Sequence, residues 1–440
     1  MRLIFIVLLC LFSQLPPPLL GAPVIEITRG QVKPEPISLV PTYSNDDSSL
    51  AKDIDQVIQN DLDTSGAFKI MDPKGFIQDN QSLIKGGIQY NSWHITKTRF
   101  IYFAKLSSSG GKVTVDFELH DVVRAKKMAS LKLDGDHRKW RRIAHMIADF
   151  IYHQVTGEDG FFNTQIAFVE PTNERGKNHN TCLKVMDIDG DKDSIFQLTD
   201  GKKLVLTPRY SPDGKSIAYL ILDKNKGEVY IADLMTKSSK LMGKYDGLNF
   251  APRYSPDGRS IVFSIAKNGS TAIYKQDLYT RQLTQITNHT NIDTSPCYSP
   301  DGKKIVFVSD RAGKPTLYTM NADGSDQVRI SFGKGSYMAP CWSPRGDMIA
   351  YMLQKGGQFY IGIMHPDGSG ERLIATGYLV EEPIWTSNGR FLIFTVQQSV
   401  RDKQYIVRMD LTGKHQYQVK TPGEACGPAL SPLLGSAIPK

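Results

Sequence analysis

Short runs of apolar residues recur at regular intervals after residue 200, and a polar turn precedes each run. Runs such as Ile217–Tyr219, Ile261–Phe263 and Ile305–Phe307 are β-branched and aromatic, which predicts strands. One proline stands at the same place in each of six units, and successive prolines are 44, 44, 44, 43 and 45 residues apart: Pro208, Pro252, Pro296, Pro340, Pro383 and Pro428. A period this regular indicates one structural unit repeated along the chain.

The turn that follows each proline has a consistent composition. Three copies read Tyr-Ser-Pro-Asp-Gly, at Tyr210–Gly214, Tyr254–Gly258 and Tyr298–Gly302. Proline presets the second position of such a turn and glycine suits its exit. Arg345 replaces Asp in the fourth copy, and the fifth reads Trp385-Thr-Ser-Asn-Gly389. Four short strands in each repeat of about 40–45 residues are typical of a β-propeller blade.

The two ends of the array together supply one more blade. Ile166–Val169, Leu183–Val185 and Ile195–Leu198 predict second, third and fourth strands with no first strand before them. Pro428–Pro432 predicts a first strand with nothing after it. We therefore expect a six-bladed β-propeller over residues 161–436, closed by a C-terminal strand in a three-plus-one blade. Such closure removes an open sheet edge.

Residues 23–157 have a different pattern, which predicts one α/β domain. Its expected elements are strands at Val24–Thr28 and Ile37–Val40, a helix through Leu50–Leu62 capped by Asn45 or Asp46, a hairpin of Phe100–Leu106 with Val113–Leu119, and a helix from Trp140 to Gly157. About 135 residues suffice for such a domain with its own core. The fold class is thus an α/β N-terminal domain followed by an all-β six-bladed propeller.

The first 22 residues predict a cleaved secretory signal. Residues 3–15 are almost wholly apolar, Pro16–Pro18 break the run, and Gly21-Ala22 offer small residues before the mature chain. The cleavage position stays open. The formal charge of +8 is scattered over the blades, so nucleic-acid binding is not expected. In an exported chain Cys182, Cys297, Cys341 and Cys426 can be buried thiols or bridged, and their spacing does not decide between these states.

The sequence contains no catalytic motif. Gly-x-Ser-x-Gly, His-Glu-x-x-His and Cys-x-x-Cys are all absent. His145, Asp149 and His153 share one side of a helix, but the apolar stripe runs elsewhere, so we expect them to face water and not to bind a metal. The alternating acidic residues Asp187–Asp193 depart from a calcium loop, and Asp189-Gly190 predicts a turn instead. We expect no catalytic residue, no metal and no cofactor.

Binding is the remaining class of function. The segments before each repeated proline are expected to connect one blade to the next and to converge at the mouth of the central channel: Val205–Thr207, Leu248–Ala251, Asp293–Ser295, Tyr337–Ala339, Val380–Glu382 and Glu424–Gly427. They mix apolar, small and acidic residues. Such a surface suits a protein or peptide better than a phosphate.

With these features in place, the chain resembles the TolB family of the bacterial Tol-Pal system. The resemblance covers the whole mature chain and is carried by the two-domain order and six segments: Val24-Ile-Glu-Ile-Thr-Arg-Gly30, Pro36–Pro41, Asp61–Phe68, Val155-Thr-Gly157, Phe161–Val169 and Ser431-Pro432. It implies a periplasmic, non-enzymatic and monomeric adaptor. Such an adaptor supports outer-membrane integrity and the inward movement of that membrane during cell division.

The resemblance also implies partners and sites. The propeller would bind the peptidoglycan-associated lipoprotein Pal, and the N-terminal segment would communicate with TolA. Other outer-membrane or peptidoglycan-associated proteins are further candidate partners, and use of the same face by bacteriocins stays open. Leu248, Ala251 and Thr294 match family positions that face Pal, and Ser295, Ala339 and Glu382 stand directly before a repeated proline. The matching switch segment consists of Val24, Ile25, Glu26, Ile27, Thr28, Arg29 and Gly30.

Two other functions stay open at this point. An exported propeller that binds carbohydrate or cell wall would need exposed aromatic residues at the mouth, for which Phe250 and Tyr337 are the candidates. A propeller lyase or hydrolase would need convergent histidines and carboxylates, but the nine histidines recur at no fixed position of the repeat. Fold alone does not choose among these functions.

Overall fold

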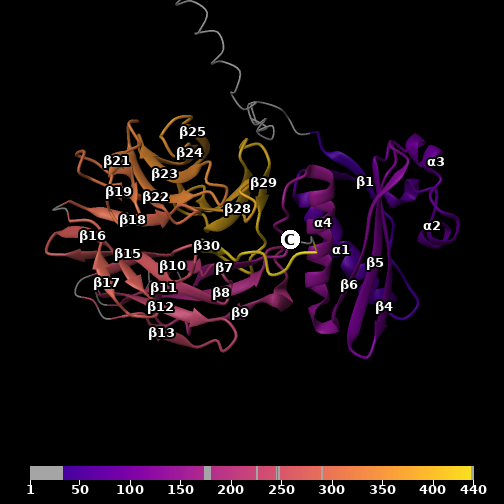
Figure 1. The fold of residues 1–440 in the computed structure, drawn as a ribbon, viewed down its shortest axis with the longest axis horizontal. Coiled ribbons are helices and arrows are strands. Elements are labelled where there is room, and N and C mark those ends of the chain that lie inside the picture. The colour runs from indigo at the N-terminus through magenta and orange to yellow at the C-terminus, as the bar shows by residue number, and fades with distance from the viewer. Residues whose placement is uncertain are drawn as a thin grey trace, which may run out of the picture. The chain divides into compact units, whose positions relative to one another are not determined.

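The computed structural model describes residues 33–172, 180–223, 226–243, 245, 248–288 and 291–437, with the backbone alone at 248 and 249. An α/β domain and a ring of six four-stranded sheets make up this part of the chain (Figure 1). The expected strand Val24–Thr28 lies outside the described residues. Within those residues no helix has the length and apolar character needed to cross a bilayer.

The α/β domain is built on one mixed sheet with the strand order β3-β1-β4-β5-β6, and β2 pairs with β4. β1 runs parallel to β3 and β4, whereas β4, β5 and β6 form an antiparallel meander. The elements are β1 (Glu35–Leu39), β2 (Tyr43–Ser44), α1 (Ser48–Thr64), β3 (Phe68–Ile70), α2 (Asn80–Gly86), α3 (Tyr90–Ile95), β4 (Phe100–Ser109), β5 (Lys112–Asp121), β6 (Lys126–Asp136) and α4 (Trp140–Thr156).

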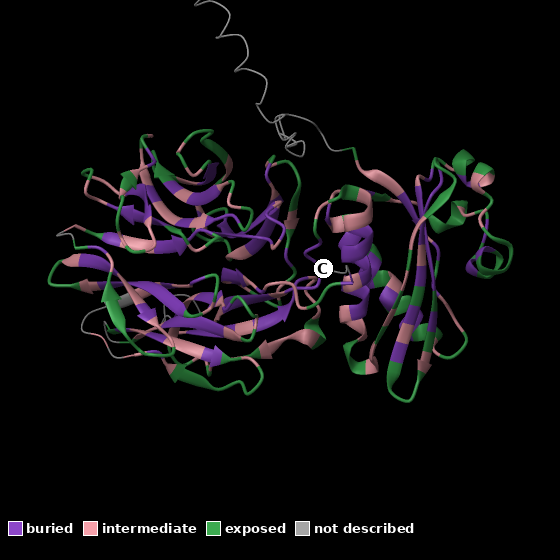
Figure 2. Cartoon of the chain, in the orientation of Figure 1, coloured by how far each residue is buried: buried purple, intermediate pink, exposed green. Residues whose placement is uncertain are grey.

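The two long helices follow the predicted apolar spacing. Leu50, Ile54 and Ile58 of α1 and Ile147 and Ile151 of α4 are buried in one core with the sheet (Figure 2). The predicted cap of α1 was wrong by one or two residues: the Asp47 carboxylate accepts from the Leu50 backbone N–H at 2.9 Å. Starting the helix at Ser48 puts Leu50 in its first turn, where it already faces the core.

Six sheets form the propeller and confirm the predicted number of blades. Five are consecutive in the chain: β10 (Leu204–Tyr210), β11 (Ser216–Asp223), β12 (Lys226–Asp233) and β13 (Ser239–Leu241); β14 (Leu248–Tyr254), β15 (Ser260–Lys267), β16 (Ser270–Asp277) and β17 (Leu283–Gln285); β18 (Asp293–Tyr298), β19 (Lys304–Ser309), β20 (Thr316–Asn321) and β21 (Val328–Arg329); β22 (Ser336–Trp342), β23 (Ile349–Lys355), β24 (Gln358–Met364) and β25 (Arg372–Gly377); β26 (Leu379–Trp385), β27 (Phe391–Gln397), β28 (Tyr405–Asp410) and β29 (Gln416–Gln418).

The sixth blade joins the two ends of the array, as predicted. Its strands are β30 (Cys426–Leu430), β7 (Gln165–Pro171), β8 (Thr181–Asp187) and β9 (Phe196–Gln197). β30 is antiparallel to β7, with Ala429 opposite Ala167. Both alanines are buried in one cluster with residues of β10 and β11, so the seam is part of the apolar core between neighbouring blades.

The polar side of α4 is buried, contrary to expectation. His145 and Asp149 are 1 % and 3 % exposed, and only His153 is half-buried. The His145 Nδ1 lies 2.6 Å from Asp61 of α1, and its Nε2 lies 3.8 Å from Asp189 of the propeller. Asp149 accepts from the backbone N–H groups of Phe162 and Asn163 at 2.8 and 3.1 Å. The helix therefore packs on two sides, with an apolar stripe toward its own sheet and a polar stripe toward the sixth blade.

We predict that His145 makes the stability of this contact depend on pH. Although burial favours the neutral imidazole, the Asp61 carboxylate raises the pKa of His145 to about 9. Because the pKa is raised in the folded state, protonated His145 adds to the free energy of unfolding, by at most about 3 kcal/mol. This contribution is complete below about pH 6.5 and is lost as the pH rises through about 9. Urea unfolding followed by tryptophan fluorescence from pH 6 to 10 should show this loss in the wild type and not in His145→Asn.

The matched control is His94→Asn, because His94 is exposed on α3. It should keep the wild-type pH dependence. Equal pH slopes for the wild type and His145→Asn would show that the imidazolium does not stabilise the contact.

Candidate functional site

Every inner strand of the propeller carries a bulge at its repeated proline. The residue before the proline has a positive φ in all six blades: 47° at Thr207, 54° at Ala251, 52° at Ser295, 45° at Ala339, 52° at Glu382 and 57° at Gly427. Pairing with the second strand skips this residue and the proline in each blade. Because a bulged residue leaves the ladder, the missing N–H of the proline costs no strand hydrogen bond.

The prediction that the segments before the prolines connect the blades is wrong: these segments are part of the inner strands. They lie in the first half of the inner strands, from Leu248 in β14 and Asp293 in β18 to Val380 in β26. The sequence suggested a break because a proline usually ends a strand. A left-handed residue just before the proline lets the strand resume its pairing two residues later.

The inner strands run side by side along the channel, so their two ends lie on opposite faces of the ring. At their carboxyl ends, Asn388 Nδ2 donates to the Asp159 carbonyl at 2.8 Å, and Arg345 pairs with Glu158 at 2.7 Å. That face therefore adjoins the junction with the α/β domain. The amino-terminal halves of the inner strands, up to the bulges, lead to the other face, which we call the channel mouth.

The predicted site residues at the mouth lie on successive inner strands. Ala251, Thr294, Ser295, Ala339 and Glu382 are all half-buried, on β14, β18, β22 and β26. Leu248 begins β14, and its side chain is not among those described. The N-terminal switch residues Val24–Gly30 also lie outside the described residues.

Charged groups that the sequence did not single out bind the acidic residues near the mouth. Arg209 Nη2 lies 3.3 Å from Glu382 Oε2, and Arg311 Nη2 lies 2.9 Å from the fully buried Asp293. Burial, followed by the charge of Glu382, raises the pKa of Glu381 to about 7. Arg209 could have been found from the repeat, since it directly follows Pro208, whereas Arg311 comes from a hairpin outside the repeated pattern.

The aromatic candidates do not form an exposed platform. Tyr337 is fully buried, and its hydroxyl donates to Glu371 at 2.7 Å. Phe250 is half-buried. The prediction that Tyr337 offers an exposed ring to a sugar is therefore wrong, because the ring of Tyr337 on β22 packs against that of Tyr351 on β23.

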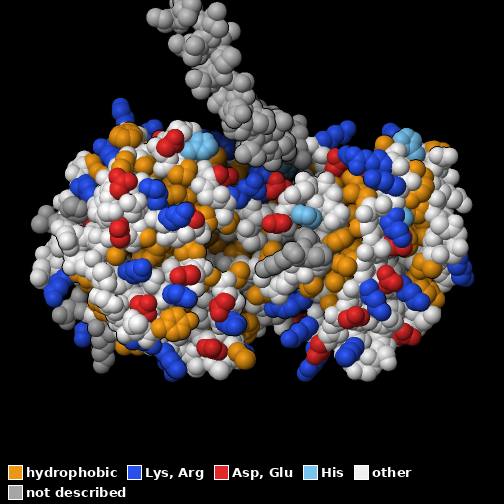
Figure 3. Space-filling model, viewed as in Figure 1, with side chains coloured by type: hydrophobic (Ala, Val, Ile, Leu, Met, Phe, Trp, Pro, Cys, Tyr) orange, Lys and Arg blue, Asp and Glu red, His pale blue; other side chains and the backbone are white. Residues whose placement is uncertain are grey.

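The acidic loop after β8 is held by cations of the protein itself. Arg141 of α4 lies 3.0 Å from Asp189 and 3.4 Å from Asp191, and His145 approaches Asp189 from the same helix. No group of three or more potential metal ligands occurs in the described ranges. On the face shown in Figure 3, Lys and Arg alternate with Asp and Glu and form no single basic field.

Comparison with known proteins identifies the family. A model of the TolB amino-terminal domain matches residues 23–128, and a model of the TolB beta propeller domain matches residues 152–434. The Tol-Pal system protein TolB of Paramagnetospirillum magneticum is 57% identical over 422 residues, which cover 93% of each chain. The chain belongs to the TolB family.

Other relatives agree with this assignment. The TolB of Pelagibacter ubique is 38% identical over 238 residues, covering 52% of each chain. The crystal structure of TolB from Acinetobacter baumannii superposes with a TM-score of 0.80 at 27% identity, over 91% of this chain and 97% of that one. The TolB-family chain is thus a non-enzymatic component of the Tol-Pal system.

The bulge predicts that Thr207→Gly stabilises the propeller. Thr207 is β-branched and has a φ of 47°, a region where such residues are strained by about 1–3 kcal/mol. Glycine adopts this φ freely but costs more backbone entropy on folding. We expect a net gain of about 0.5–1 kcal/mol in the free energy of unfolding, measured by urea denaturation.

Thr284→Gly provides the matched control on the exposed outer strand β17, which has ordinary strand geometry. It should lose about 0.5–1 kcal/mol. A similar loss in Thr207→Gly would argue against strain at the bulge.

Proposed function

We propose that this TolB-family chain is a periplasmic adaptor that binds Pal at the channel mouth and communicates with TolA through residues 24–30. Membership of the family along 93% of the chain carries the proposal. On this reading residues 1–22 are a cleaved signal, residues 23–157 form the α/β domain, and residues 161–436 form the propeller. The adaptor role supports outer-membrane integrity and invagination during division.

The form of the mouth supports a protein ligand. Successive inner strands present the small, half-buried side chains of Ala251, Thr294, Ser295 and Ala339, with the acidic pair Glu381 and Glu382 beside them. Small side chains let another backbone approach closely, and the few charged groups give the contact its register. The bulges fix these positions because each is set by a left-handed residue and a proline.

Titration calorimetry of the mature protein with the soluble domain of the cognate Pal tests the first part. We expect saturable one-to-one binding, weakened at least about 10-fold in Thr294→Arg, because a long cation would enter a close contact. Thr284→Arg on the outer strand is the matched control and should bind as the wild type does.

Ala251→Glu provides a second test if Thr294→Arg folds poorly. Glu382 already occupies the equivalent bulged position in another blade, so the backbone there accepts glutamate. No heat with two folded partners at several temperatures would overturn the Pal assignment and put a cell-wall ligand first. Binding that both variants leave unchanged would move the site away from the mouth.

The N-terminal segment gives a separate prediction. Replacing residues 24–30 by a Gly-Ser segment of equal length should abolish binding to the soluble domain of TolA. Pal should still bind, with an affinity changed only by the coupling between the two sites. Titration of each partner into the wild type and the replacement variant measures both effects, and unchanged TolA binding would contradict the role of the segment.

A further inference from the structure

One layer of the channel wall is formed by the residue that directly follows each repeated proline. All six of these residues line a single cavity of about 500 Å³, on the carboxyl side of the bulges: Arg209, Arg253, Cys297, Cys341, Ile384 and Ala429. The backbone repeats at this layer, but the chemistry does not. Two neighbouring blades supply cations, the next two supply thiols, and the last two supply apolar groups.

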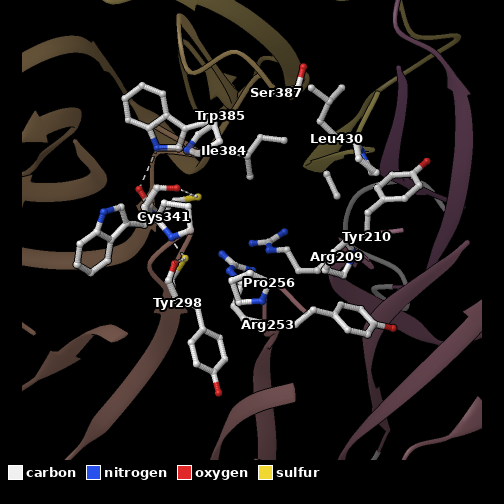
Figure 4. Close-up of a pocket in the computed structure, with 18 of the residues that line it drawn as sticks. Arg209, Tyr210, Arg253, Pro256, Tyr298, Cys341, Ile384, Trp385, Ser387 and Leu430 are labelled. Atoms are coloured by element: carbon white, nitrogen blue, oxygen red, sulfur yellow. Dashed lines mark hydrogen bonds between the residues drawn. The ribbon is translucent and has the colours of Figure 1, made fainter. Parts of the chain in front are cut away.

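The two arginines point into the cavity from adjacent inner strands, β10 and β14 (Figure 4). Arg209 is 8 % exposed and donates through Nη1 to the Pro208 carbonyl at 2.6 Å, but its buried Nε has no hydrogen-bond partner among the described groups. Arg253 donates to the Pro252 carbonyl only at 3.5 Å, and it forms no ion pair with any carboxylate of the described ranges. A guanidinium has five donors, so both retain capacity for a ligand.

The positive charge of this layer is incompletely balanced. The described lining of the cavity contains Arg209 and Arg253 and no Asp or Glu. The carboxylate partner of this layer is Glu382, at 3.3 Å from Arg209; burial raises the pKa of that carboxyl, and the charge of Arg253 acts in the opposite direction. The Cys341 thiol and then the Arg253 guanidinium lower the pKa of Cys297, against the effect of burial. Partly buried cations without a matching anion are costly, which favours a bound counter-ion.

The wall facing the arginines is apolar. Ile384, Trp385 and Leu430 lie across the cavity from them (Figure 4). The Trp385 indole N–H is already satisfied by the Cys341 carbonyl at 2.9 Å, so the ring offers hydrophobic area rather than a free donor. A cavity with convergent cations on one side and aromatic or aliphatic walls on the other matches an anion that has an apolar body.

We propose that this cavity binds a small organic anion, with a carboxylate or phosphate group on Arg209 and Arg253 and its apolar part against Ile384 and Trp385. The oxyanion accepts charge-assisted hydrogen bonds from the two guanidinium groups, which present planar donor pairs suited to such groups. The site begins in the layer next to the bulges, on the side of the α/β domain, whereas the proposed Pal surface lies on the other side of the bulges. It does not rest on the Pal assignment.

Titration calorimetry of the full mature protein at low ionic strength tests this site with phenyl phosphate, inorganic phosphate and benzyl alcohol. Phenyl phosphate should bind one to one and more tightly than either of the others, since only it has both the oxyanion and the apolar body. Arg253→Gln should weaken it at least about 10-fold through loss of charge-assisted hydrogen bonds. Arg253→Lys keeps the charge and should recover part of the affinity.

Arg253→Gln is preferred to Arg209→Gln because Arg253 has fewer hydrogen bonds to lose, and its unfolding temperature checks that it folds. Arg372→Gln, at an exposed position of β25, is the matched control and should leave binding unchanged. Equal affinity for inorganic phosphate would overturn the organic class of ligand. Binding that Arg253→Gln does not weaken, or that benzyl alcohol matches, would overturn the site.

Cys297→Ser removes the alternative counter-ion of Arg253, a thiolate at Cys297. Unchanged affinity for phenyl phosphate would support the proposal, because it would show that no Cys297 thiolate competes with the ligand for Arg253 in the native chain. Binding that appears only in Cys297→Ser would overturn it.

Discussion

The bulge in each inner strand is the constraint on which the propeller depends. A left-handed residue followed by proline interrupts the pairing at one point in all six blades, and it thereby sets which side chains face the channel. Without the skipped pair, the alternation of the strand would place the residue after the proline on the other face of its sheet. The same local geometry thus determines both the half-buried groups at the mouth and the ring that contains Arg209 and Arg253.

Most of the architecture could be predicted from the sequence because it is repeated. The prolines, the Ser-Pro-Asp-Gly turns and the split blade gave the number of blades, and the apolar spacing gave α1 and α4. The positive φ at Thr207, Ala339 or Glu382 could not be predicted, since none of these residue types favours it. The burial of His145 could not be predicted either. The second packed side of α4 is held by ion pairs, so the sequence of the helix shows only one apolar stripe.

The two ends of the channel differ because the repeat conserves backbone geometry and not side-chain chemistry. Near the mouth, small residues alternate with the acidic pair of β26, whereas the far layer carries two cations on β10 and β14. Arg209 belongs to both regions, since its guanidinium lines the cavity and also reaches Glu382. An anion that competes with Glu382 for the Arg209 guanidinium would change the electrostatic potential at the mouth. Binding in the cavity and the charge of the mouth are therefore coupled through Arg209.

The contact between the α/β domain and the propeller is partly apolar and partly polar. Phe161, Phe162 and Phe391 join the apolar core of the domain. Beside them, His145 lies between Asp61 and Asp189, and Arg141 reaches the same acidic loop. Buried ion pairs add little net stability compared with apolar packing, but they are intolerant of misplacement, because each displaced charge is left without a partner. Such a contact defines one docked arrangement sharply, and a change in one of its charges destabilises that arrangement.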